Sequence, residues 1–373
     1  MPRYVIDELA LRRNLQTLKC VSDRTGARIL LAQKAFSCTA VYPLCAQYLS
    51  GTTASSLFEA RHGHDNFGGE THVFAPAFAP EEMDELLGLV DHIVFNSPRQ
   101  IEKFGAAARR RGVSVGLRVN PEVSVVTTPA YDPCRPHSRL GVTRAELSGS
   151  AAKCLDDVDG LHFHCLCEQG LDELRAVLAG FESRFGDLLP RMKWVNFGGG
   201  HHITRADYDV DGLVSLLNDF RTRHPNLMVY LEPGEAVALN AGTLESRVLE
   251  IQPVGADGVA NAILDTSAAC HMPDVLEMPY APPVAGAKKG LAGPFAYRFG
   301  GPTCLAGDEI GTYSFERPLA EGEKVVFCDM AIYTMVKNNT FNGLNLPDIV
   351  IRREDGREET VRRFSYEDFA TRL

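Results

Sequence analysis

The sequence predicts an α/β protein that consists of a (β/α)8 barrel followed by a mostly β domain. Eight short apolar segments alternate with helical patterns between residues 27 and 232, and a different rhythm of short strands separated by Gly and Pro begins near residue 241. A chain of 373 residues is long enough for two domains. We expect the barrel to span residues 8–240 and the β domain to span 241–373, with residues 1–7 packing on the β domain.

The eight candidate strands are short and rich in apolar or β-branched residues, which is typical of parallel strands that are buried on both faces. They cover residues 27–32, 52–56, 72–76, 92–96, 113–120, 160–166, 194–198 and 227–232. Eight strands that alternate with helices are what a (β/α)8 barrel requires. A doubly wound sheet is the alternative, and the pattern alone does not exclude it.

Helical patterns lie between these strands. Residues 97–112 begin with Ser97 as N-cap, Pro98 in the first turn and Gln100 in a capping-box position. Residues 79–90 open with a proline and acidic residues, and residues 171–185 and 208–224 are amphipathic. The basic run 109–111 precedes Gly112, which indicates a helix C-terminus.

Composition narrows the possible partners. The net charge is −10 and the isoelectric point is about 5.6, so nucleic acid is not an expected partner. No run of about 18 apolar residues is present to span a membrane. The ten cysteines include no CxxC pair and follow no secretory signal, so we expect free thiols in the cytoplasm.

Four chemically notable features follow the candidate strands. Lys34 lies just after the first strand, His164 near the end of the sixth, the glycine run 198–200 after the seventh, and Glu232 at the end of the eighth. In a barrel the carboxyl ends of all strands meet on one face, which is where barrel enzymes place their chemistry. A surface lysine at a strand end and a plain glycine turn are the alternatives for the first and third features.

Together these features suit pyridoxal 5'-phosphate (PLP). Gly198, Gly199 and Gly200 would let backbone N–H groups approach a phosphate closely. Glu232 would keep a pyridine nitrogen protonated, so that the ring accepts electrons. Lys34 would form a Schiff base with the aldehyde, and His164 could stack on the ring.

A metal site is an alternative for the segment around His164. His162, His164, Cys165, Cys167 and Glu168 are all possible ligands. Adjacent residues of a strand point to opposite faces, however, so the five side chains cannot converge. A buried histidine pair satisfied by hydrogen bonds is the simplest interpretation of His162 and His164. We therefore expect no metal.

Several motifs resemble those of the alanine-racemase-fold PLP decarboxylases, which include the ornithine, arginine and diaminopimelate enzymes. The motifs are QKAF (33–36), FHC (163–165), NFGGGHHIT (196–204), LEPGEA (231–236), GPTCLAGD (301–308) and YTMVKNNTFNG (333–343). The local variants, together with CHMPDVLEMPY (270–280), are similar to the carboxynorspermidine/carboxyspermidine decarboxylase branch. The likeness runs from residue 3 to residue 343.

The resemblance implies a PLP-binding barrel joined to a β domain, in a homodimer whose active sites are shared between two chains. It implies these roles: Lys34 for the Schiff base, His164 for ring stacking, Glu232 for the pyridine nitrogen, Gly198–Gly200 for the phosphate, Tyr333 near the phosphate, and Cys304 donated across the dimer interface. Asp308 falls near the family's acidic residue that follows this cysteine and is expected to bind substrate.

One position departs from the family pattern. Many relatives have an arginine after EPG that contacts phosphate, whereas this chain has Glu235. An acid there could meet a substrate ammonium, and Asp274 is a second candidate for that role; a solvated loop residue is the alternative for Asp274. The expected substrate is a small polycationic amino acid.

The implied activity is decarboxylation of carboxynorspermidine or carboxyspermidine to norspermidine or spermidine. Alternatives are a decarboxylase of another basic amino acid (diaminopimelate, ornithine or arginine type), a racemase on the same fold, a non-catalytic PLP-binding barrel, and a metal-dependent barrel hydrolase. A non-catalytic barrel would lack the second domain, and a racemase would need an acid or base on each face of the ring.

Overall fold

The computed structural model describes residues 1–373, which form two compact units. The first unit contains Asn14–Lys34 and Val41–Val237. The second contains Met1–Arg13, Ala35–Ala40 and Ala238–Leu373. None of the helices has the length and apolar character that crossing a membrane requires.

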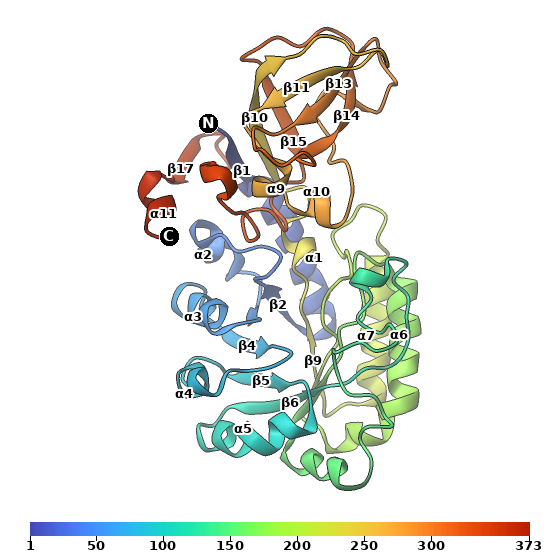
Figure 1. The fold of residues 1–373 in the computed structure, drawn as a ribbon. Coiled ribbons are helices and arrows are strands. Elements are labelled where there is room, and N and C mark those ends of the chain that lie inside the picture. The colour runs from blue at the N-terminus through green and yellow to red at the C-terminus, as the bar shows by residue number, and fades with distance from the viewer. The chain divides into compact units, whose positions relative to one another are not determined.

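The first unit is a closed barrel of eight parallel strands (Figure 1). The strands are β2 (Arg28–Ala32), β3 (Gly51–Ala54), β4 (Glu70–Phe74), β5 (His92–Phe95), β6 (Ser114–Arg118), β7 (Gly160–His162), β8 (Trp194–Asn196) and β9 (Met228–Leu231). The first and last strands pair directly, with Arg28 opposite Tyr230 and Ile29 opposite Leu231. This pairing closes the sheet, confirms the predicted barrel and excludes the doubly wound alternative.

Helices surround this barrel (Figure 1). They are α1 (Glu8–Thr25), α2 (Tyr42–Cys45), α3 (Leu57–Asn66), α4 (Met83–Leu86), α5 (Pro98–Arg110), α6 (Leu171–Phe185), α7 (Val210–Arg223) and α8 (Glu235–Ala238). At the start of α5 the Ser97 hydroxyl accepts a hydrogen bond from the backbone N–H of Gln100, as predicted. The Gln100 side chain reaches one residue further back than a capping box requires and accepts from the N–H of Asn96.

The helix expected over residues 79–90 is much shorter in the structure. Pro80–Glu82 form a 3-10 turn, and α4 adds only Met83–Leu86. The N–H of Gly88 then bonds to the carbonyl of Glu85, three residues back, which tightens and ends the helical turn. Glycine is a poor helix former, so the apolar pattern beyond this point is not helical.

The second unit is a nine-stranded, mixed sheet, as expected for a mostly β domain. Its order is β12-β14-β13-β11-β10-β1-β16-β17, and β15 also pairs with β10. The strands are β1 (Arg3–Asp7), β10 (Gly242–Ile251), β11 (Ala260–Leu264), β12 (Lys288–Lys289), β13 (Phe295–Gly300), β14 (Glu309–Phe315), β15 (Lys324–Cys328), β16 (Asp348–Arg352) and β17 (Glu358–Arg362). Short helices α9 (Ala268–His271), α10 (Asp274–Glu277) and α11 (Tyr366–Ala370) complete the unit. Its core includes Phe299, Tyr313 and Phe327, all fully buried.

Within the barrel, Trp194 on β8 lies directly against the backbone of neighbouring strands. A Cβ atom added to Gly160 on β7 would lie 2.0 Å from the Trp194 ring, and one added to Gly116 on β6 would lie 2.4 Å from it. Only glycine leaves room for the indole there. The Trp194 N–H donates to the Ser114 hydroxyl at 2.9 Å, which fixes the ring in place.

We expect Gly160→Ala to destabilise the protein by about 1–3 kcal/mol, because the methyl group overpacks a fixed indole ring. Thermal unfolding would measure the loss. Gly186→Ala is the matched control, because nothing lies within 4 Å of the Cβ position there and the backbone is helical. Equal stability of the two variants would contradict the assigned contact.

Candidate active site

The predicted site residues of the barrel unit lie at the carboxyl ends of adjacent strands. Lys34 follows β2 by two residues, His164 follows β7 by two residues, and Glu232 follows β9 directly. The glycine run begins two residues after β8. Strand β7 ends at His162, earlier than the expected segment 160–166, so His164 stands on the loop beyond it.

Glu232 is a buried carboxylate with a donor at each oxygen. The Asn196 side-chain N–H donates to Oε1 at 2.8 Å, and His162 Nε2 lies 3.2 Å from Oε2. Burial by itself raises the pKa of Glu232, but the neighbouring His162, His72 and Asn196 outweigh it and lower the pKa to about 2. The carboxylate is therefore ionised at neutral pH.

Asn196 connects this carboxylate to the glycine run. Its side-chain oxygen accepts a hydrogen bond from the Gly198 N–H at 2.8 Å, so its amide nitrogen must face Glu232. The backbone N–H of Glu232 in turn donates to the Gly198 carbonyl at 2.8 Å. Two hydrogen bonds thus hold the end of β9 to the end of β8 and its loop, and the third, from Gly198 to Asn196, lies within that loop.

The glycine run requires glycine for steric reasons. Gly198 and Gly200 have φ values of 70° and 86°, in the left-handed region. A Cβ atom on Gly199 would lie 2.1 Å from the carbonyl oxygen of Glu232. The backbone N–H groups of Gly200 and His201 donate no hydrogen bond within the chain, so this concave turn offers free donors to an anion.

His164 is held in one protonation state. The Gly199 N–H donates to its Nδ1 at 2.8 Å, so Nδ1 is an acceptor and carries no proton. Burial, followed by the positive charges of Lys34 and Arg118, lowers the pKa of His164 well below its usual value. The ring is therefore a neutral imidazole.

Lys34 is accessible to solvent, yet the surrounding barrel lowers its pKa. Loss of hydration is the main cause and the positive charge of Arg118 adds to it, while Glu232, Cys167 and Glu235 partly oppose both. A lysine with a lowered pKa offers more unprotonated amine, which is the nucleophilic form. The preceding residue is fixed, because Gln33 donates to the Glu59 carbonyl and accepts from the Tyr42 hydroxyl.

Three residues of this cluster were not among the predicted cofactor-site residues, although His162 was expected to be buried and hydrogen-bonded. Arg118, the last residue of β6, is buried, donates to the His164 carbonyl at 3.0 Å and lies over the Phe74 ring at 4.4 Å. Burial lowers the pKa of Arg118 to about 10. Asn196 and His162 are the donors to Glu232. A polar residue at the end of an apolar strand segment, as in GLR, GLH and WVN, is the signal that could have indicated all three.

Glu235, the first residue of α8, has a partner of its own. Its carboxylate lies 2.8 Å from Nε2 of His202, and both side chains are buried. The structure therefore places the acid that replaces the usual arginine against a histidine from the segment after the glycine run.

The other four predicted residues belong to the sheet unit. Asp308 is buried and accepts hydrogen bonds from the Ser267 hydroxyl, the Ala269 N–H and the Thr303 hydroxyl. Cys304 is exposed, and its N–H donates to the Asn342 side chain at 2.7 Å. Tyr333 has a φ of 47° and donates its backbone N–H to the Ala35 carbonyl.

Asp274 begins α10 and is buried, which differs from a solvated loop residue. Its carboxylate is bonded by the Lys337 ammonium, which also bonds Glu277. Burial opposes the charge on Lys337, but these two acids raise its pKa overall. Two carboxylates and one ammonium leave a net negative charge at this place.

One group of metal-ligating side chains, Glu70, His72 and His92, lies elsewhere in the barrel. The His72 and His92 rings are stacked, with centroids 4.0 Å apart and planes 8° apart. Nitrogen lone pairs lie in the ring plane, so those of stacked rings run parallel and do not converge on one ion. Arg28 also pairs with Glu70. The geometry does not suit a metal centre.

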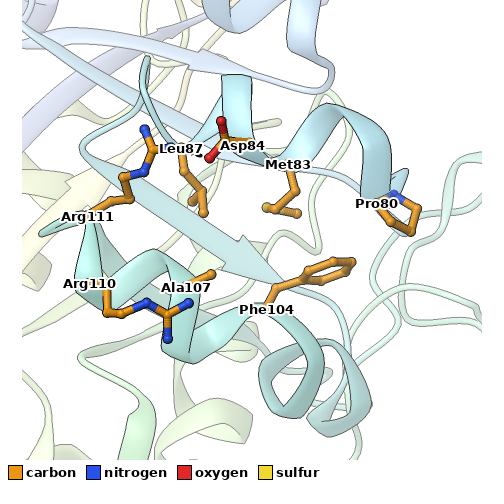
Figure 2. Close-up of a pocket in the computed structure, with 8 residues that line it drawn as sticks. All are labelled: Pro80, Met83, Asp84, Leu87, Phe104, Ala107, Arg110 and Arg111. Carbon is orange, nitrogen blue, oxygen red and sulfur yellow. Dashed lines mark hydrogen bonds and ion pairs between the residues drawn. The ribbon is translucent and has the colours of Figure 1, made fainter.

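A hollow of about 500 Å³ between α4 and α5 lacks the side chains that catalysis requires (Figure 2). It is lined by Pro80, Met83, Asp84, Leu87, Phe104, Ala107, Arg110 and Arg111. Its single carboxylate, Asp84, is paired with Arg111. The lining contains no histidine, cysteine or lysine that could act on a substrate.

Comparison with known proteins places these features in a family. Residues 3–331 match the family model described as pyridoxal-dependent decarboxylase, C-terminal sheet domain. The chain is 40% identical to the carboxynorspermidine/carboxyspermidine decarboxylase of Campylobacter jejuni, over all of this chain and 98% of that protein. It is also 40% identical to the carboxyaminopropylagmatine decarboxylase of Synechocystis, over all of this chain and 95% of that protein.

A solved structure is similar over the whole fold. The crystal structure of carboxynorspermidine decarboxylase complexed with norspermidine from Campylobacter jejuni aligns with a TM-score of 0.92 and 40% identity, and the alignment covers 100% of both chains.

The buried histidines predict how stability depends on pH. His201 is 1% exposed, and both of its ring nitrogens lack hydrogen-bond partners. Burial lowers the pKa of His201 from 6.5 to about 4, so the unfolded chain binds this proton first as pH falls. The contribution of a neutral His201 to the free energy of unfolding is therefore complete above pH 6.5 and is lost progressively as pH falls toward 4.

His201→Leu should therefore become more stable relative to the wild type as pH falls from 7 to 4, by about 3 kcal/mol if the site stays dry. Denaturant unfolding at several pH values measures this. His64→Leu, at an exposed position on α3, should follow the wild type throughout. Parallel pH profiles for His201→Leu and the wild type would contradict the prediction.

Proposed function

Because this chain belongs to the pyridoxal-dependent decarboxylase family, we propose that it decarboxylates carboxynorspermidine and carboxyspermidine in polyamine biosynthesis, with PLP as its cofactor. The observation that carries the proposal is the barrel site itself. A lysine with a lowered pKa, a buried ionised carboxylate and a loop with free N–H donors lie on adjacent strand ends. The full-length similarity to relatives named for these substrates supports the choice of substrate.

The residues present fit PLP. Its protonated pyridine ring withdraws electrons from the substrate carbon that loses CO2. We propose that Lys34 supplies the amine that bonds the aldehyde, that Gly198–Gly200 present N–H groups to the phosphate, and that Glu232 holds the ring nitrogen protonated. Tyr333 is proposed to lie near the phosphate. His164, neutral and fixed by Gly199, would offer a flat face to the ring without adding charge.

During the reaction the bond between the α-carbon and the carboxylate breaks, CO2 leaves, and one proton is added to the same carbon. We propose that the Cys304 thiol of a second copy of the chain donates this proton. Asp308 would support that step by shaping the loop that carries Cys304, since it accepts hydrogen bonds from Ser267, Ala269 and Thr303. We further propose that Asp308 contributes to substrate binding, in addition to shaping this loop.

A polycationic substrate needs carboxylates beyond the reacting centre. We propose that Asp274 provides one, because the group formed with Glu277 and Lys337 keeps a net negative charge. Glu235 is the other proposed carboxylate, although His202 already takes one of its oxygens. The ten free cysteines suit the cytoplasm, which is the proposed location.

Carboxyaminopropylagmatine is a second candidate substrate. The relative named for it is as similar to this chain as the relative named for the triamines, at 40% identity. Agmatine ends in a guanidinium group rather than an ammonium. A planar guanidinium prefers a carboxylate that can accept two parallel hydrogen bonds. The aligned crystal structure is complexed with norspermidine, which favours the ammonium substrates.

We predict CO2 release from carboxynorspermidine and carboxyspermidine by the purified protein with PLP, at a kcat/KM at least about tenfold above that for carboxyaminopropylagmatine, diaminopimelate, ornithine or arginine. Side-by-side assays of the six compounds measure this. Lys34→Ala should abolish release, because no other amine is placed to bond the aldehyde.

A higher kcat/KM for carboxyaminopropylagmatine would leave the PLP chemistry unchanged but would make this guanidinium compound the substrate. Preference for diaminopimelate, ornithine or arginine would overturn the polyamine assignment altogether. Substantial turnover by Lys34→Ala without added amine would contradict the role of this lysine.

The shared active site gives a further prediction. Cys304→Ala should still lose CO2 but yield much less amine product, because the carbon is no longer protonated by the thiol. Mixing inactive Lys34→Ala with Cys304→Ala should restore about a quarter of wild-type amine formation, since half of the dimers would be mixed and one of their two sites intact.

Sedimentation of the wild type, which should be a dimer, accompanies the mixing assay. The matched control mixes Lys34→Ala with a Lys34→Ala, Cys304→Ala double variant, which should restore nothing. An unchanged product distribution for Cys304→Ala, or no recovery in mixtures shown to exchange subunits, would overturn the proposed role of Cys304.

A further inference from the structure

His162 is the one ring that bonds the buried carboxylate of the site. It is the last residue of β7 and is 1% exposed. Its Nε2 lies 3.2 Å from Glu232 Oε2. The Phe74 ring stacks beside it with centroids 5.6 Å apart, and the Arg118 guanidinium lies over the same phenyl ring, 4.4 Å from its centroid. The imidazole is therefore fixed in orientation by packing.

The hydrogen bond determines the tautomer of His162. An ionised carboxylate only accepts, so the proton must be on Nε2. Nδ1 is then an unprotonated acceptor, and it is buried without a partner. Burial lowers the pKa of His162 and keeps the ring neutral. His162 thus acts on Glu232 as a directed hydrogen-bond donor.

Glu232 needs both of its donors. Each carboxylate oxygen has two lone pairs, of which Asn196 takes one on Oε1 and His162 takes one on Oε2. One lone pair on each oxygen is left for a ligand. Asn196 is anchored at its other end by Gly198, whereas His162 is anchored only by packing.

We propose that His162 is a positioning residue that keeps Glu232 oriented and ionised, so that the carboxylate can hold the pyridine nitrogen of the cofactor protonated. This inference rests on the proposed function. It differs from a purely structural role, because a packing histidine would affect stability without affecting the charge of Glu232.

Other charged or titratable groups act on the same carboxylate. They are His72 from β4, Lys34 after β2 and Arg118 from β6. None of the three donates a hydrogen bond to Glu232. They remain in place when His162 is replaced, so loss of the Nε2–H removes one bond while the burial of the carboxylate persists. The carboxylate should then take up a proton at higher pH.

The test compares His162→Leu with His162→Gln, whose amide N–H can donate in place of Nε2–H. For His162→Leu we expect the dissociation constant for PLP to rise about tenfold and the acid limb of kcat/KM to move up by about one pH unit. His162→Gln should recover most of both. PLP titration of the apoprotein, followed by absorbance, gives a measurement that does not depend on turnover.

His224→Leu is the matched control, because this partly buried ring follows α7 and contacts Glu182 and Phe220, which belong to none of the groups that act on Glu232. It should alter the melting temperature and leave PLP affinity and the acid limb unchanged. Unchanged PLP affinity and acid limb in His162→Leu, or no recovery in a folded His162→Gln, would overturn the proposal. A wild type that binds PLP but decarboxylates none of the tested compounds would overturn the proposed substrates, while PLP affinity would still decide the role of His162.

Discussion

The arrangement of the barrel site depends on keeping one carboxylate ionised away from water. An unpaired ionised carboxylate in a protein interior costs several kcal/mol, which usually leads to protonation. Glu232 escapes this because strands β7 and β8 each supply a donor, through His162 and Asn196. A hydrogen bond to a charged acceptor is worth about 1.5–3 kcal/mol, so two such bonds can offset the burial.

The same bonds organise the rest of the site. Asn196 cannot donate to Glu232 without presenting its oxygen to Gly198, and the glycine run that results presents the Gly199 N–H to His164. Each of these groups lies at the end of its strand or within three residues of it. The closed barrel brings those ends together, so the local geometry of three loops depends on strand pairing elsewhere. A change in β7, β8 or β9 would therefore disturb the carboxylate, the loop and the imidazole together.

Much of this could be predicted from sequence, and the reason is topological. Lys34, the glycine run and Glu232 are separated by many residues, but each follows an apolar strand segment, and parallel strands in a barrel end on one face. The side-chain partners could not be predicted. Nothing in the segment HHI indicates that His202 pairs with Glu235, because the two belong to different loops.

Local competition explains other differences between prediction and structure. The helix expected over residues 79–90 ends early, since Gly88 favours a tight turn over the continuing apolar pattern. The strand expected over 160–166 stops at His162. The Phe163 N–H still bonds the Asn196 carbonyl of β8, but the next carbonyl on that side, of His164, accepts from the Arg118 side chain and not from a strand. In the sequence Arg118 is indistinguishable from an ordinary strand residue. Its contact with His164 arises only when the closed barrel brings the ends of β6 and β7 together.

The neutral state of the buried histidines, such as His164 beneath the Gly199 N–H, has a consequence for a cell whose internal acidity varies. With His162, His164, His72 and His201 all shifted below their usual pKa, these rings keep a constant charge across the neutral range. Histidine is the side chain that most often makes proteins respond to small changes in acidity. Here the four imidazoles around the strand ends stay neutral, so small changes in acidity near neutral pH do not alter the charge of the site through its histidines.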